Sequence, residues 1–152
     1  MAGLFRRDGV ARAEGDVEAV ATWSGWLATA AIVLAALVPI VQRMRAGKRA
    51  APGSAPIRLH VTVGLATAAL AFLHTMAVLP ALGSPAAIGG GVFALLPAGA
   101  AFFLLVAHAG LGLQLRDPKL KDRARKRRMH TTTAVLIAAT VTIHIVMLVR
   151  AG

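Results

Sequence analysis

Four histidines form two pairs with identical spacing. His74 follows His60 at the same distance along the chain at which His144 follows His130. In an α-helix, this separation of about 14 residues corresponds to about 21 Å of rise and just under four turns, so the two imidazoles of a pair point in nearly the same direction. Two parallel helices that carry these pairs would therefore place imidazoles opposite each other at two depths.

Two facing imidazoles are the axial ligands of a bis-histidine haem, which has no free coordination position and therefore suits electron transfer rather than oxygen chemistry. The spacing predicts two non-covalent haem b groups, the inner one on His60 and His130 and the outer one on His74 and His144. The chain has no cysteine, which excludes covalent c-type haem and thiolate-held iron–sulfur clusters. Gly64 lies on the His60 face and is predicted to let the porphyrin approach the helix backbone.

Three further residues are candidates near the inner pair. Arg58 and Arg128 each precede a ligand histidine by two positions, and an arginine at the membrane interface can pair with a haem propionate. They would equally serve as ordinary basic residues that set topology. His108 would bind a propionate, line a quinone pocket, replace one of the four ligands, or simply hydrogen-bond a neighbouring helix.

The elements that would position these residues are four long apolar segments. The chain is 57% hydrophobic with a mean hydropathy of +0.70, which places it in the membrane class. Each segment is long enough to cross a hydrocarbon core of about 30 Å, which needs about 20 helical residues. We therefore predict an all-α integral membrane four-helix bundle, with residues 1–19 as an N-terminal tail and 20–152 as the transmembrane domain. The segments span residues 20–41, 57–82, 87–115 and 129–149.

The charges orient this bundle. The net charge is +11, and the basic residues are concentrated in the connections between segments one and two and between segments three and four. The connection between segments two and three, residues 81–91, carries no charge. The positive-inside rule predicts both basic connections in the cytoplasm and both termini outside, in a bacterial inner membrane. This distribution indicates topology and contact with anionic lipid, not nucleic-acid binding.

The histidines also indicate an internal repeat. A single offset along the chain aligns His60 with His130 and His74 with His144. The same offset roughly superposes segment one on segment three. The chain is therefore predicted to contain two helical-hairpin repeats in the same orientation, related by an axis along the membrane normal.

With this spacing, residues 20–150 resemble the four-helix di-haem b core of the cytochrome b subunit of cytochrome bc complexes. They also resemble the membrane domain of ferric reductases and NADPH oxidases and, with differently distributed ligands, the cytochrome b561 family. The resemblance implies a conduit for electrons. The chain departs from these families because it has no extra quinone-site helices and no PEW loop, no nucleotide-binding domain and no basic site in its outer connection.

Transmembrane electron transfer between quinol or protein redox partners is therefore the function that we expect, with the chain alone, as a homodimer or as a subunit of a larger complex. The alternative is a haem-bearing membrane anchor for a larger oxidoreductase. A third interpretation, a metal-ion or proton transporter, is disfavoured by the scarcity of carboxylates in the apolar segments.

Overall fold

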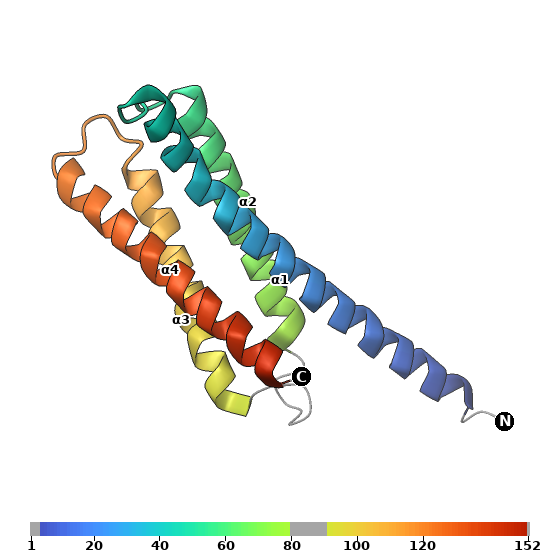
Figure 1. Cartoon of the computed structure of the whole chain (residues 1–152). Coiled ribbons are helices and arrows are strands. Elements are labelled where there is room, and N and C mark those ends of the chain that lie inside the picture. The colour runs from blue at the N-terminus through green and yellow to red at the C-terminus, as the bar shows by residue number, and fades with distance from the viewer. Residues whose placement is uncertain (1–3, 80–90, 152) are drawn as a thin grey trace.

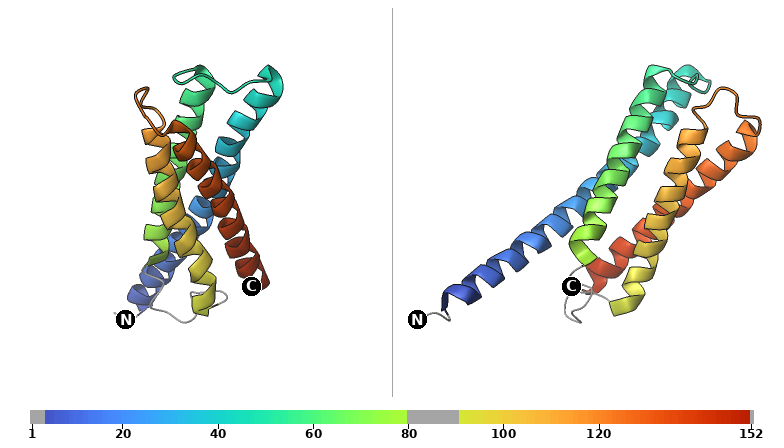
Figure 2. Two further views of the ribbon diagram at one scale, coloured as in Figure 1. Left: turned by 90° about the vertical axis from the view of Figure 1, so that its left-hand side faces the viewer. Right: turned by 180° about the vertical axis from the view of Figure 1, so that it is seen from behind.

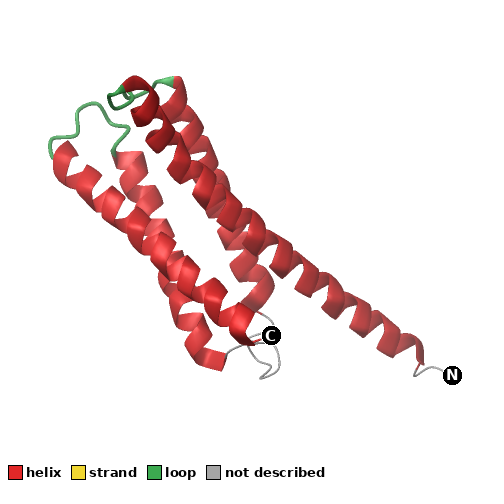
Figure 3. Cartoon of the chain, in the orientation of Figure 1, coloured by secondary structure: helices red, strands yellow, loops and turns green. Residues whose placement is uncertain are grey.

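Four α-helices make up the computed structural model, which describes residues 4–79 and 91–151. The described residues contain no strand (Figures 1 and 3). All four helices are long and apolar enough to span a bilayer, so the predicted all-α membrane four-helix bundle is confirmed. The helices are α1 (Leu4–Ala46), α2 (Ala55–Val78), α3 (Gly91–Gln114) and α4 (Arg123–Ala151).

The helices differ from the predicted segments mainly at their N-termini. α1 begins at Leu4, so residues 4–19 of the predicted tail are helical, and α1 extends well beyond the bundle (Figure 1). Its candidate membrane span is Glu18–Ala46. α4 begins at Arg123 rather than at residue 129. Arginine, alanine and lysine are good helix formers, so the backbone stays helical where hydropathy has already fallen. Predicted residues 80–82 and 87–90 lie outside the described residues.

The end of α1 and the start of α2 follow from local chemistry. After Ala46, Gly47 adopts a φ of +63°, the left-handed conformation that commonly ends a helix. Ser54 occupies the N-cap position of α2, and Pro56 stands in the first turn, where its missing N–H has no helical partner to lose. Pro39 and Pro97 lie inside α1 and α3, as expected of membrane helices that accommodate proline.

The helices form two antiparallel hairpins. α1 packs along α2, and α3 packs along α4, while the hairpins contact each other mainly through α2 with α3 (Figures 1 and 2). The connections within the two hairpins lie at the same end of the bundle, which we call the basic end because these connections carry the basic residues. α2 and α4 both start there and therefore run in parallel. They occupy diagonal positions and scarcely touch.

Small and medium-sized side chains fill the interior, and many large apolar ones point outward. The buried apolar residues are Ala28, Ala94, Leu105, Leu111 and Ile137. Large side chains such as those of Trp23 and Phe103 are 68% and 74% exposed. Lipid solvates apolar side chains as well as a protein core does, and close helix packing in a bilayer favours small residues. The outward apolar surface is therefore a lipid-facing surface.

Candidate cofactor site

The four paired histidines all bind the neighbouring helix of their own hairpin through Nδ1. In each case the acceptor is a backbone carbonyl. A carbonyl can only accept, so Nδ1 carries the proton, and Nε2 of each neutral imidazole retains its lone pair for a metal or a donor. The Nδ1 to oxygen distances are 2.8 Å for His60 to Ala35, 2.8 Å for His74 to Ala21, 3.1 Å for His130 to His108 and 3.1 Å for His144 to Ala94.

The acceptors repeat the spacing of the donors. Ala21 and Ala35 on α1 are separated by as many positions as His60 and His74 are on α2. Ala94 and His108 on α3 have this separation too, matching His130 and His144 on α4. Antiparallel packing keeps both bonds of a hairpin in register only if donors and acceptors share one spacing. The two hairpins therefore hold their histidines in the same way, with two imidazoles about four turns apart on one helix. This agrees with the predicted hairpin repeat.

Glycine allows two of these imidazoles to lie against the partner helix. Gly25 stands four positions after the acceptor Ala21, and a Cβ at Gly25 would lie 3.0 Å from Cε1 of His74. Gly112 stands four positions after the acceptor His108, and a Cβ there would lie 3.3 Å from Cε1 of His130. Both imidazoles occupy space that any larger residue would partly fill.

A proline occupies the equivalent position beside His60. Pro39 stands four positions after the acceptor Ala35. Proline has no N–H, so the Ala35 carbonyl lacks the intrahelical i→i−4 hydrogen bond that it would otherwise accept. The bond from His60 Nδ1 satisfies this carbonyl inside the apolar span, where an unsatisfied backbone group is costly. Pro39 therefore leaves the Ala35 carbonyl available to accept the hydrogen bond from His60.

Near the basic end, the imidazoles of α2 and α4 meet. The ring centres of His60 and His130 are 6.0 Å apart, and their planes are inclined by 83°. Two imidazoles that bind opposite sides of one metal through bonds of about 2 Å place their ring centres about 6 Å apart. We call His60 and His130 the basic-end pair. We call His74 on α2 and His144 on α4 the distal pair.

The residues around the basic-end pair leave open space beside Gly64 of α2. α2 and α4 are diagonal and scarcely in contact, so the imidazoles of the basic-end pair come from helices that do not otherwise pack against each other. Gly64, predicted to line the cofactor, has no atom of a neighbouring helix within 4 Å of the place where its Cβ would stand. Gly64 therefore offers open space one turn beyond His60. Among the described residues, no group of three or more His, Cys, Asp or Glu side chains is arranged to hold a bare metal ion.

The fifth histidine, His108, joins the basic-end pair from α3. Its ring stacks on His130 with centres 3.7 Å apart, and its carbonyl accepts the Nδ1 hydrogen bond of His130. Its own Nδ1 lies 2.9 Å from Oγ1 of Thr133, whose hydroxyl donates to the His130 carbonyl. Because that hydroxyl proton is already used, His108 must be the donor to Thr133. The predicted hydrogen bond from His108 to a neighbouring helix is confirmed. Its roles as a ligand, propionate partner or quinone contact stay predictions.

The two arginines that the sequence treats alike are placed differently. Arg58 is exposed and donates from Nη1 to the Gly53 carbonyl at 2.6 Å, which ties it to the connection before α2. Arg128 instead lines a cavity with Arg49 and Arg127. Pairing of Arg58 and Arg128 with propionates stays a prediction.

Sequence reasoning did not identify the partners that orient the histidines. The carbonyl acceptors carry no side-chain signal, because three of the four belong to ordinary alanines within apolar helices. Two signals were available in retrospect. For three of the four histidines, a glycine or proline stands four positions after the acceptor on the preceding helix, and Thr133 follows His130 by three positions on the same face of α4.

Comparisons with protein-family models, curated protein sequences and solved structures give no significant match.

Proposed function

We propose that this chain is a di-haem b membrane protein that carries electrons across a bilayer. The observation that carries the proposal is the shared state of the four paired histidines. Each is anchored at Nδ1 by a carbonyl 2.8–3.1 Å away and keeps Nε2 available as a ligand atom. An Nδ1–H donated to a backbone carbonyl is the usual way in which a metal-binding imidazole is oriented and made more basic.

The separation within the basic-end pair supports the same proposal. Ring centres 6.0 Å apart suit axial ligation of one iron, and the second pair follows about 21 Å along the same helices. Haem b supplies reversible one-electron chemistry when it is bound. The residues of the chain hold two such groups at different depths and exclude water with apolar helices. Between them the two pairs cover much of the thickness of the hydrocarbon core, about 30 Å.

We further propose that the basic end faces the cytoplasm of a bacterial inner membrane, with both termini on the other side. The support is the concentration of basic residues in the two connections at that end. The chain has no native cysteine, so single cysteines report topology without a background. A membrane-impermeant thiol reagent added outside should label Arg150→Cys but not Ala51→Cys or Lys119→Cys. The reverse pattern would invert the orientation.

Haem stoichiometry tests the central proposal. The purified wild-type chain should give reduced-minus-oxidised haem b bands and two haems per chain. His60→Ala and His74→Ala should each lower the ratio to one. His108→Ala is the matched control, since it removes a histidine that contacts the basic-end pair through stacking and its backbone carbonyl. That variant should retain two haems.

Two outcomes would change the assignment. Absence of haem bands from the wild-type chain, folded as judged by circular dichroism, would refute the proposal. Loss of one haem in His108→Ala, with both haems retained in one of the variants His60→Ala and His130→Ala, would make His108 the axial ligand in place of that histidine. The alternative role as a haem-bearing anchor shares these spectra. It differs in predicting that a peripheral subunit co-purifies and that the isolated chain does not reduce external acceptors.

A further inference from the structure

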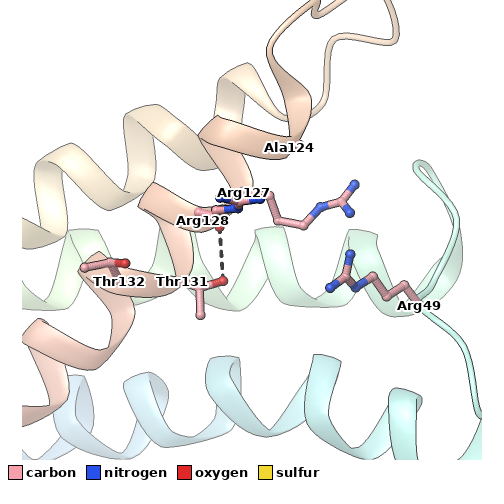
Figure 4. A pocket seen from close by; sticks show the side chains of 6 residues that line it. All are labelled: Arg49, Ala124, Arg127, Arg128, Thr131 and Thr132. Carbon is pink, nitrogen blue, oxygen red and sulfur yellow. Dashed lines mark hydrogen bonds between the residues drawn. The ribbon is translucent and has the colours of Figure 1, made fainter.

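A cavity lined by three arginines lies at the basic end, between the two hairpins. It has a volume of about 520 Å³ and is open to the outside. Arg49 comes from the connection between α1 and α2, and the other lining residues come from the first turns of α4 (Figure 4). The lining contains no acidic residue. The lining residues are Arg49, Ala124, Arg127, Arg128, Thr131 and Thr132.

The positive groups converge on this cavity. Figure 4 shows the side chains of Arg49 and Arg127 extending toward each other from opposite sides. Two guanidinium groups repel unless an anion lies between them, and a guanidinium matches the oxygens of a phosphate through paired hydrogen bonds. The hydroxyl of Thr131 already donates to the Arg127 carbonyl at 3.0 Å. The positive charge that an anion would meet here comes from the arginines.

The position of the cavity selects among phosphate-bearing ligands. Arg127 and Arg128 are the last charged residues of α4 before its apolar part, which begins at residue 129, so they lie at the level of lipid headgroups. One turn deeper on the same face, Val135 and Leu136 are 64% and 45% exposed. A ligand with its phosphate on the arginines would find an apolar surface directly below for an acyl chain.

We propose that this cavity, which we call the arginine cavity, binds the phosphate headgroup of an anionic phospholipid and so ties the two hairpins together at the basic end. Basic cavities between membrane helices are typical sites for anionic lipid headgroups. The proposal does not depend on haem, since it uses Arg49 and Arg127 and neither His60 nor His130. Its consequence is structural, because a lipid held from both sides links hairpins that contact each other sparingly.

The test is native mass spectrometry of the full chain in detergent, titrated with phosphatidylglycerol. The variant is Arg49→Gln with Arg127→Gln. The matched control is Arg43→Gln with Arg45→Gln, which removes the same charge from the last turn of α1 at the same end, away from the arginine cavity. We expect the first variant to bind phosphatidylglycerol about tenfold more weakly and the control to change by less than about twofold. Phosphatidylcholine should bind weakly to all three.

Further measurements distinguish a lipid headgroup from free phosphate and from a haem propionate as the bound anion. Equal weakening in both double variants would overturn the proposal in favour of a diffuse field. Displacement of phosphatidylglycerol by millimolar inorganic phosphate would assign the arginine cavity to free phosphate instead. Loss of haem from the first variant with unchanged lipid binding would assign it to a propionate. If the glutamine variant does not fold by circular dichroism, Arg49→Lys with Arg127→Lys serves. This lysine variant keeps the positive charges but loses the paired hydrogen bonds that a guanidinium makes to a phosphate. We expect it to bind phosphatidylglycerol about threefold more weakly, and unchanged binding would refute the proposal.

Discussion

Gly25→Ala should loosen the distal haem while leaving the basic-end haem in place. An added Cβ would lie 3.0 Å from Cε1 and 3.1 Å from Nδ1 of His74. Ordinary contact between such atoms starts at about 3.5 Å, so the imidazole must move by several tenths of an ångström. The bond from Nδ1 to the Ala21 carbonyl, now 2.8 Å, would then be stretched or misaligned.

The size of the effect follows from that hydrogen bond. A typical intramolecular hydrogen bond contributes about 0.5–1.5 kcal/mol, so its loss should weaken haem binding at the distal pair by about 2- to 12-fold. Replacing a helical glycine by alanine adds about 0.5–1 kcal/mol of helix stability in its own right. Gly99→Ala on α3 is the matched control, because a Cβ there would meet nothing within 4 Å.

The assay is transfer of haem from the purified chain to excess apo-myoglobin, followed optically, together with the electron paramagnetic resonance of the low-spin ferric signals. Gly25→Ala should release one of two haems faster and shift one signal, whereas Gly99→Ala should match the wild type in both. Equal behaviour of the two variants would show that His74 does not hold the distal cofactor against α1, and the reasoning from the backbone hydrogen bonds would fail.

Three other substitutions test neighbouring parts of the site. Pro39→Ala restores an N–H that competes for the Ala35 carbonyl. The temperature of thermal unfolding should therefore rise, while haem transfer from the basic-end pair should become about threefold faster. A higher unfolding temperature without faster haem transfer would contradict the role given to Pro39. Thr133→Val should keep two haems per chain but shift the reduction potential of the basic-end haem in a spectroelectrochemical titration, because His108 loses its hydrogen-bond partner; an unchanged potential would show that His108 does not influence the site. Gly64→Leu fills the open space beside α2 and should lower the haem-to-protein ratio measured optically, whereas an unchanged ratio would place the porphyrin elsewhere.

Hydropathy was sufficient to predict the four helices, and the common offset between the histidine pairs predicted their arrangement as two hairpins. Apolar length is a strong signal because a bilayer admits few backbone arrangements. The boundaries at the basic end were predicted less well. Residues 123–128 are charged yet helical, because hydropathy reports where a helix is immersed in lipid and not where its hydrogen bonds begin.

The spacing of the histidines predicted that His60 and His130 meet, but not how the orientation of the four imidazoles is fixed. A separation of nearly four turns on one helix implies two depths in the membrane. The choice of Nδ1 as donor depends instead on the backbone carbonyls of Ala35 and Ala21, and every helix residue has such a carbonyl. Only the packing of α1 against α2 determines that the carbonyls of Ala35 and Ala21 become the acceptors. The residues that permit the selection, Gly25 and Pro39, are ordinary in a membrane helix, and their role becomes specific because each stands four positions after an acceptor. The same offset relates Gly112 to the acceptor His108, but Ala94 is followed at this offset by Ala98, so the rule identifies three of the four anchored imidazoles.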